Sequence, residues 1–300
     1  MSSTTSSPTA TPHAPLAAIL WMGGVLLSFI AMAISAREAG EELAAIQLLF
    51  YRSLVGITLV VAFAACTSRG VAGLATKRLG AHVVRNCFQF VGQFGWFYAI
   101  AMIPLAQVFA IEFTAPLWVG LMAPLVLGER MTKGRLVSLS MGFIGILVVV
   151  RPGLVEFNNG TLAILIGALG FAAGMIMTKR LTTTESALQV IFYMSVVQAV
   201  LSGPPAMLDP VLPSWTALAW VVMVTIAGLS AHACMVRAFT LADALTIVPI
   251  EFLRLPLVMM LAVLLYGEPF DLWILLGGSL ILFGNYYNLR SERRAAKRGR

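Results

Sequence analysis

Residues 45–53 read Ala-Ile-Gln-Leu-Leu-Phe-Tyr-Arg-Ser, and residues 187–195 read Ala-Leu-Gln-Val-Ile-Phe-Tyr-Met-Ser. The two stretches share Ala, Gln, Phe, Tyr and Ser at a constant offset of 142 residues. A second motif, Ile-Glu-Phe, occurs at 111–113 and returns at 250–252, an offset of 139. Self-similarity over such a distance indicates a duplicated structural unit.

The composition is that of an integral membrane protein. Hydrophobic residues make up 59% of the 300 residues and charged residues 11%, and the mean hydropathy is +0.91. A soluble domain carries roughly 25% charged residues. Cys66, Cys87 and Cys234 lie in or beside apolar runs, at spacings that fit neither a disulfide framework nor a metal site. We therefore expect an all-helical membrane chain without metal or cofactor.

Ten segments are apolar and long enough to span a bilayer, which takes about 20 residues. The predicted spans are residues 15–35, 44–66, 81–102, 104–127, 135–151, 159–179, 184–205, 214–236, 243–266 and 272–289. They form two five-helix units, at 15–152 and 159–289. Residues 1–14 are rich in Ser, Thr and Pro and are expected to be a disordered cytoplasmic N-terminus, and residues 290–300 form a basic cytoplasmic tail.

Lys and Arg predict how the chain is oriented. Sixteen of the 20 fall on one side of the predicted spans, Arg37 and Arg151 fall on the other, and Arg52 and Arg254 lie within spans. Because cytoplasmic loops collect Lys and Arg, we expect both termini in the cytoplasm. The net charge of +7 is then a topology signal, and no nucleic-acid partner is expected.

Five spans in each unit, an odd number, make the second unit enter the membrane from the opposite side. The two units are then related by a pseudo-two-fold axis in the membrane plane. Inverted repeats of this kind hold their substrate near the bilayer midplane and open to either side in turn. Duplication for packing alone is the alternative.

Two carboxylates and two guanidiniums lie deep within the predicted spans. Glu112 and Glu251 follow the starts of their spans by about eight residues, which corresponds to a depth of about 12 Å in a core about 30 Å thick. A charge at that depth costs about 2.5–3.5 kcal/mol on insertion scales. Glu251 can pair locally with Arg254, three residues on. Glu112 would have to meet Arg52 across helices. The pairs either lock the bundle or line a polar cavity.

Two prolines favour the cavity. Pro116 follows Glu112 by four residues, and Pro256 follows Phe252 by four residues. Proline lacks an N–H, and its ring displaces the carbonyl four residues earlier. Irregular backbone at membrane depth survives only where protein covers it or where it lines a water-filled cavity. We therefore expect a helix kink beside a carboxylate in the fourth span of each unit.

Several further side chains are candidates for the substrate path. Gln47 and Gln189 recur in register, as do Tyr51 and Tyr193; they either line the path or bond across helices. The third span carries polar and aromatic groups at helical spacing, namely Gln89, Gln93, Phe94, Trp96, Phe97 and Tyr98. Trp96 and Tyr98 are candidate stacking partners for a ligand, with packing as the alternative.

Other residues are expected to serve structure. Glu129 and Glu268 each follow a glycine at a helix end and are expected to fix the turn into the next span. Gly170 and Gly174 form a small-residue pair that lets helices approach closely.

The motifs together resemble those of the drug/metabolite transporter superfamily, EamA type. They are Phe-Tyr-Arg at 50–52, Ile-Pro-Leu-Ala at 103–106, Phe-Thr-Ala-Pro-Leu at 113–117 and Leu-Gly-Glu-Arg at 127–130. The resemblance covers nearly all of 15–290 and implies ten helices, cytoplasmic termini and secondary transport of small organic solutes. Carriers in that family take up riboflavin or S-adenosylmethionine, or export amino acids or metallophores. The second unit departs from the pattern, with Met194 in the place of Arg52 and Leu255 in the place of Pro116.

The chain is therefore predicted to be a bacterial inner-membrane carrier of a small polar or zwitterionic metabolite. Arg52 is expected to anchor an anionic group, because a guanidinium grips a carboxylate bidentately. Glu112 is expected to bind a cationic group or to carry a coupling proton. The remaining candidate binding residues are Trp96, Tyr98, Gln47, Gln189, Tyr193, Glu251 and Arg254.

Other functional classes fit less well. The sequence has no Gly-x4-Gly-Lys-Ser/Thr loop for ATP, and neither a His-Glu-x-x-His nor a Gly-x-Ser-x-Gly motif. We expect no enzyme activity. A receptor or scaffold that transports nothing is the alternative. The substrate, the direction of transport, the coupling ion and the choice between monomer and homodimer stay open at this stage.

Overall fold

The computed structural model describes residues 15–298 except 69, 128–130, 154–156 and 243. The predicted disordered segment 1–14 and Glu129 lie outside the described residues. The helices are α1 (Pro15–Ala39), α2 (Ala45–Ala65), α3 (Leu79–Met102), α4 (Leu105–Glu112), α5 (Ala115–Leu127), α6 (Lys133–Val150), α7 (Asn159–Leu181), α8 (Ala187–Ala206), α9 (Trp215–Leu241), α10 (Ala244–Glu251), α11 (Arg254–Tyr266) and α12 (Leu272–Arg298), with a short 3-10 turn, η1 (Val71–Leu74), before α3.

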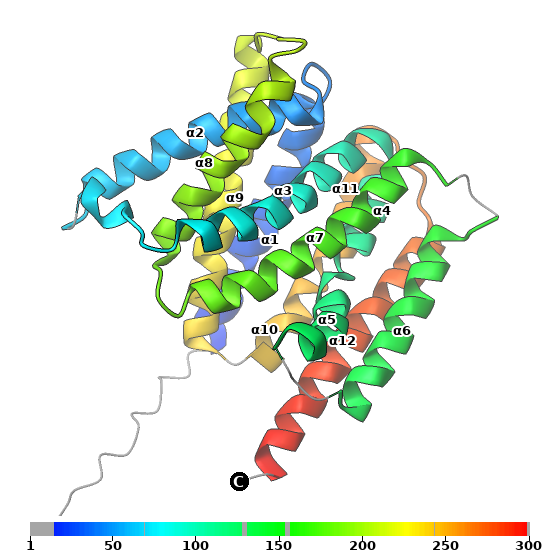
Figure 1. The fold of residues 1–300 in the computed structure, drawn as a ribbon. Coiled ribbons are helices and arrows are strands. Elements are labelled where there is room, and N and C mark those ends of the chain that lie inside the picture. The colour runs from blue at the N-terminus through cyan, green and yellow to red at the C-terminus, as the bar shows by residue number, and fades with distance from the viewer. Residues whose placement is uncertain (1–14, 69, 128–130, 154–156, 243, 299–300) are drawn as a thin grey trace, which may run out of the picture.

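The chain has the all-helical membrane fold that its sequence predicts (Figure 1). In the described part of the chain, nine segments are long and apolar enough to cross a membrane. The tenth predicted span is α3, which has the length but carries polar side chains, including His82, Arg85 and Asn86. These three are buried inside the protein, so their polarity is directed at neighbouring helices. α12 continues to Arg298 and includes most of the predicted basic tail.

The fourth predicted span of each half is interrupted in its middle. α4 ends at Glu112 and α5 begins at Ala115, immediately before Pro116. In the second half α10 ends at Glu251 and α11 begins at Arg254. Each half therefore has a carboxylate at the end of a half-helix, and the second break also has a guanidinium at the start of the next one.

The first break is covered by another helix. The N–H of Leu117 bonds to Thr114 O instead of continuing the α-helical ladder. The carbonyl oxygen of Phe113 accepts a hydrogen bond from Asn285 Nδ2 of α12 at 2.9 Å. A backbone carbonyl in the membrane interior needs such a partner, so α12 stabilises the interruption.

The main helix contacts join the first half, α1–α6, to the second half, α7–α12. α1 packs along α9, α3 along α7, α2 along α8 and α6 along α12; Figure 1 shows α3 beside α7 and α6 beside α12. Exchanging the two halves turns the α1–α9 pair into the α7–α3 pair, and it leaves α2–α8 and α6–α12 unchanged. The pairing is thus the same from either half.

The short helix α4 lies at the centre of the largest apolar core. Six of its residues are buried, namely Leu105, Ala106, Val108, Phe109, Ala110 and Ile111. A helix that is apolar all round belongs in the protein interior. Since Glu112 ends this helix, its carboxylate is delivered to the middle of the bundle.

Glycines allow the close approach of α3 and α7. A Cβ on Gly95 would lie 2.3 Å from the carbonyl oxygen of Ala163, and a Cβ on Gly170 would lie 2.7 Å from Gly92 N. The contacts involve backbone atoms, which cannot move aside as a flexible side chain would. Small residues at such crossings bring membrane helices into direct backbone contact.

We predict that Gly95→Ala destabilises the protein and Gly80→Ala does not. Both glycines lie in α3, but a Cβ on Gly80 would meet no atom within 4 Å. Alanine favours a helix over glycine by roughly 0.5–1 kcal/mol, whereas overpacking costs about 1–3 kcal/mol. Apparent melting temperatures in detergent should fall by several degrees for Gly95→Ala alone. Equal shifts for both variants would contradict this account of the interface.

Candidate functional site

The Glu112 carboxylate is held by side chains from both halves of the chain. Trp96 Nε1 donates to its Oε2 at 2.8 Å, and Arg254 Nη2 lies 3.2 Å from its Oε1. Trp96 belongs to α3, and Arg254 is the first residue of α11. The ion pair therefore bridges the two helix breaks.

Arg254 is buried, with 3% of its side chain exposed. Its Cζ lies 4.3 Å from the ring centroid of Phe29, 4.4 Å from that of Phe113 and 5.1 Å from that of Phe109. A desolvated cation over aromatic faces gains about 2 kcal/mol or more. These rings hold the guanidinium in place beside Glu112.

A second carboxylate shares the same guanidinium. Glu251 Oε1 lies 4.0 Å from Arg254 Nη2, the i,i+3 contact that its spacing predicts. Glu112 and Glu251 keep 19% and 27% of their side chains exposed. We call Glu112, Glu251 and Arg254 the acidic cluster. With all three ionised its net charge is −1, so one further positive charge would neutralise it.

Arg52 has a different environment. Its Nη1 donates to Gln93 Oε1 at 2.5 Å, and its Cζ lies 5.6 Å from the Phe97 ring centroid. Gln93 Nε2 in turn lies 3.9 Å from Met194 Sδ. Among the described residues no carboxylate lies within ion-pair distance of Arg52, and its Nε is buried without a hydrogen-bond partner.

The expected pairing of Glu112 with Arg52 is wrong. Glu112 pairs with Arg254, and Arg52 bonds a neutral amide. The physical reason is the second helix break, which starts α11 at Arg254 where α11 contacts α4. Sequence spacing suggested only the local partner of Arg254, Glu251.

One face of α3 connects the two charged regions. Gln93 contacts Arg52, and Trp96, three residues later, contacts Glu112. Three residues correspond to about 4.5 Å along a helix. The Trp96 and Phe97 rings meet edge to face, with centroids 5.1 Å apart. Arg52 and Glu112 thus both contact α3, at side chains three residues apart, beside the Trp96–Phe97 ring pair.

Gln47 is engaged at a helix start. Its Oε1 accepts a hydrogen bond from Ala44 N, and its Nε2 donates to Asp209 O at 2.6 Å. Tyr51, one turn later, donates its hydroxyl to Val211 O at 2.7 Å. Both side chains fasten α2 to the α8–α9 loop. They therefore bond across helices, and neither has a described contact with the acidic cluster.

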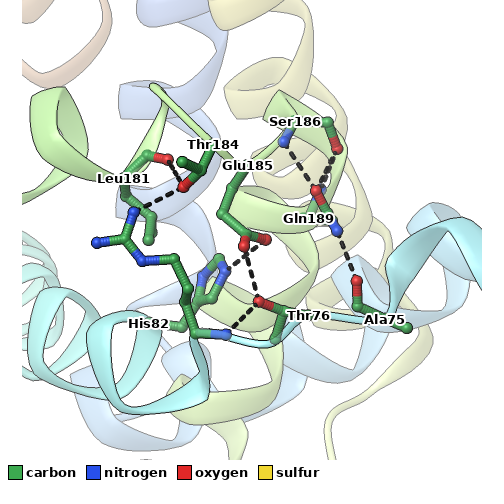
Figure 2. Close-up of polar contacts among 9 residues, drawn as sticks. Ala75, Thr76, His82, Leu181, Thr184, Glu185, Ser186 and Gln189 are labelled. Atoms are coloured by element: carbon green, nitrogen blue, oxygen red, sulfur yellow. Dashed lines mark hydrogen bonds and ion pairs between the residues drawn. The ribbon is translucent and has the colours of Figure 1, made fainter.

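Gln189 does the same in the second half. Its Oε1 accepts from Ser186 N at 2.8 Å, and its Nε2 donates to Ala75 O at 2.7 Å, which fastens α8 to the α2–α3 loop (Figure 2). The ring of Tyr193 packs against His82, with centroids 4.5 Å apart. Neither residue has a described contact with Glu112, Glu251 or Arg254.

Tyr98 also lies away from the acidic cluster. Its ring stacks on Phe94, and Phe94 stacks on Phe90, at centroid distances of 6.0 and 6.2 Å. This ladder runs along a face of α3 different from that of Trp96, because residues two apart point to opposite sides of a helix. Of the two predicted stacking residues, Trp96 alone contacts Glu112.

The sequence reasoning missed some participants. The sequence places Gln93 in a polar stripe of the third span but does not identify it as the partner of Arg52. Its spacing of three residues before Trp96 was the available signal. Phe29, Phe109 and Phe113 gave no signal, because an aromatic residue in an apolar helix is ordinarily packing. Among the described residues no group of three or more His, Cys, Asp or Glu side chains could hold a metal ion.

We predict that Glu112 is coupled energetically to Arg254 and not to Arg52. In double-mutant cycles with Glu112→Gln, the Arg254→Gln cycle should give an interaction free energy of about 1–3 kcal/mol. The Arg52→Gln cycle should give a value near zero. Unfolding of the purified protein in detergent measures both cycles. Comparable coupling to both arginines would contradict the pairing described.

Comparison with known proteins assigns the chain to a family. The profile of the EamA-like transporter family matches residues 16–151 and 158–290. An S-adenosylmethionine uptake transporter of Rickettsia prowazekii (strain Madrid E) is 26% identical over 273 residues, covering 90% of this chain and 92% of that protein. A riboflavin transporter of Brucella anthropi is 28% identical over 242 residues, covering 79% and 85%.

Export also occurs among the relatives. The pseudopaline exporter CntI of Pseudomonas aeruginosa is 27% identical over 278 residues, covering 88% of this chain and 94% of that protein. One solved crystal structure matches the fold with a TM-score of 0.64 at 20% identity, over 93% of this chain and 98% of its own. The chain is a multi-pass membrane protein that belongs to the EamA-like transporter family, and it is a transporter of small metabolites.

Proposed function

We propose that the protein is a secondary carrier of the bacterial inner membrane for a small zwitterionic metabolite, with S-adenosylmethionine-like uptake as the first candidate. The observation that carries the proposal is the acidic cluster at the two helix breaks, with its net charge of −1. Ionised groups inside a membrane protein mark substrate or ion pathways. No chemical conversion of the substrate is part of the proposal.

The charge of the acidic cluster favours one of the relatives' substrates. S-adenosylmethionine carries an ammonium and a sulfonium, a carboxylate and a planar adenine. Either of its cations suits a cluster with one uncompensated negative charge. Riboflavin is planar but has no cation, so it would leave that charge unpaired at a cost.

Alternating access follows from the two halves in this proposal. We infer that the halves are inverted, with both termini in the cytoplasm, because Lys and Arg collect on that side. The identical pairing of helices seen from either half fits a two-fold relation between the halves, and five spans in each half would make that relation an inverted one. On this orientation the α1–α2 and α8–α9 loops are periplasmic, and the α2–α3 and α7–α8 loops are cytoplasmic.

Each side has a carboxylate that fastens two loops belonging to different halves. On the cytoplasmic side Glu185 accepts from Thr76 Oγ1 at 2.9 Å and lies 3.2 Å from His82 Nε2 (Figure 2). On the periplasmic side Glu42 accepts from Ser214 N and Oγ at 2.5 and 2.6 Å. We infer that these two fasteners open in turn during transport.

The periplasmic fastener resists mild acid. The Ser214 hydroxyl, and then its backbone N–H, hold the pKa of the Glu42 carboxyl below its usual value. A lowered pKa keeps the ionised contact fully present above the ordinary carboxyl pKa, and the contact is lost as pH falls through the lowered value. A moderately acidic periplasm would therefore leave this fastener closed.

A proton and a cationic ligand group would compete for the acidic cluster. Glu112 and Glu251 share one guanidinium, and either a proton or a cation neutralises the excess charge. We propose Glu112 as the coupling residue of the acidic cluster, because it lies at the break between α4 and α5 and keeps 19% of its side chain exposed. The apparent KM of a cationic substrate should then rise as pH falls.

Transport in proteoliposomes tests the function. We expect saturable exchange of radiolabelled S-adenosylmethionine, inhibited by the unlabelled compound and not by riboflavin. Glu112→Gln should lower this exchange at least tenfold and remove its pH dependence. Glu292→Gln is the matched control, because its carboxylate pairs with Arg135 at 2.7 Å outside the acidic cluster. Preloading the vesicles measures flux in the outward direction as well.

Three results would count against the proposal. Absence of flux in correctly folded protein would favour a receptor or scaffold. Transport of riboflavin in place of S-adenosylmethionine would contradict the proposal that the substrate is a zwitterion. If the Glu112→Gln variant kept the pH dependence of transport, the proposed proton-coupling role of Glu112 would be contradicted.

We predict that loss of the Glu185 contact and loss of the Glu42 contact open the protein to opposite sides of the membrane. Ser195 is buried between α2 and α8, so Ser195→Cys in a cysteine-free background reports opening. Glu185→Gln should increase its labelling by an impermeant maleimide from the cytoplasmic side, and Glu42→Gln from the periplasmic side. Increases on the same side for both variants would contradict alternating fasteners.

A further inference from the structure

Arg52 is a cation in the membrane interior whose charge is not neutralised by any described neighbour. It lies in the first half of α2, facing Gln93 and Phe97 of α3. Its Nη2 is 3.7 Å from the position of a Cβ on Gly228, so the other side of the guanidinium lies against the backbone of α9. A lone charge in this setting is unfavourable unless a partner of opposite charge binds it.

The unused atoms of Arg52 form one edge of the guanidinium. Nη1 is occupied by Gln93, whereas Nε is buried without a partner and Nη2 makes no hydrogen bond to a described residue. Nε and Nη2 are the side-on pair of donors that a carboxylate engages with two parallel hydrogen bonds. Gln93 therefore holds the guanidinium and leaves its carboxylate-binding edge without a hydrogen-bond partner among the described residues.

We propose that the Nε–Nη2 edge of Arg52 binds the carboxylate of the transported molecule while the acidic cluster binds its cation. This inference rests on the proposed carrier function and specifies the ligand as one with both charges in a single head group. Arg52 supplies +1 and the acidic cluster −1, so a zwitterion neutralises both regions at once.

The two regions are connected through α3. Gln93 and Trp96, the α3 contacts of Arg52 and Glu112, lie three residues apart in the sequence of that helix. An α-amino acid head group carries its ammonium and carboxylate on one carbon, so it supplies one charge for each region. A dianion or a dication would satisfy only one region.

The two halves are not equivalent at this subsite. Met194 occupies the position of Arg52 in the second half, and its sulfur contacts the same Gln93 amide. The subsite therefore has one guanidinium and can take one carboxylate. A single anion anchor fixes which end of the ligand faces α2, so the molecule binds in one orientation.

The test compares S-adenosylmethionine with its decarboxylated analogue, which retains the sulfonium and an amine. The wild-type protein should take up the carboxylate form at least tenfold more efficiently, by kcat/KM. Arg52→Gln should abolish that preference, mainly by raising KM for S-adenosylmethionine and not for the analogue. Arg52→Lys keeps the charge without the planar fork and should restore only part of the preference.

Arg85→Gln is the matched control. Arg85 is a buried arginine on α3 that bonds Thr178 and Asn86. It should retain the wild-type preference. Ligand-dependent thermal stabilisation in detergent provides the same comparison for a variant that folds but transports slowly.

The outcomes separate the inference from the proposed function. Uptake of S-adenosylmethionine by the wild type with equal preference in Arg52→Gln would overturn the carboxylate subsite and leave the carrier intact. A wild type that neither binds nor transports either compound would overturn both. A tenfold preference lost in Arg52→Gln and kept in Arg85→Gln is the supporting result.

Discussion

The ion pair between Glu112 and Arg254 is the contact around which the rest of the structure is arranged. Each partner sits at an interrupted helix, one at the end of α4 and the other at the start of α11. Neither charge tolerates hydrocarbon alone, and the nearest charged partner of each belongs to the other half of the chain. The indole of Trp96 and three phenylalanine rings complete the surroundings. This ion pair therefore forms only where the two halves are packed together.

The polar helix α3 is the second consequence of that arrangement. It fails a hydropathy criterion that the other spans meet, yet its polar groups are directed at α2, α4, α7 and α8. Close packing makes this possible, since Gly92 and Gly95 bring α3 against the backbone of α7. Along one face it then presents Gln93 to Arg52 and Trp96 to Glu112. A more apolar α3 would span the membrane more readily but could not connect the two charged regions.

Much of the fold follows from the sequence, because apolar length and Lys/Arg distribution are summed over many residues. The ten segments were predicted close to their observed positions, and the interruptions occur beside Pro116 and Pro256. The pairing of individual charges did not follow. Glu112 had two arginines available, and only the relative position of α4 and α11 decides between them. Partners on different helices depend on crossing geometry, which a hydropathy pattern does not contain.

Residues that recur in both halves serve structure, whereas the residues around the buried charges differ between the halves. Identical residues in the two halves, Gln47 and Gln189, perform the same task, capping a helix and fastening the neighbouring loop of the other half. Positions that differ or act differently surround the charges: Arg52 corresponds to Met194, and Glu112 makes two close contacts where Glu251 makes one distant one. The two glutamines thus make equivalent helix-to-loop contacts in the two halves. The ligand proposed above is asymmetric and would contact different side chains from each half, so on that proposal the departures from the repeat are the better guide to where it binds.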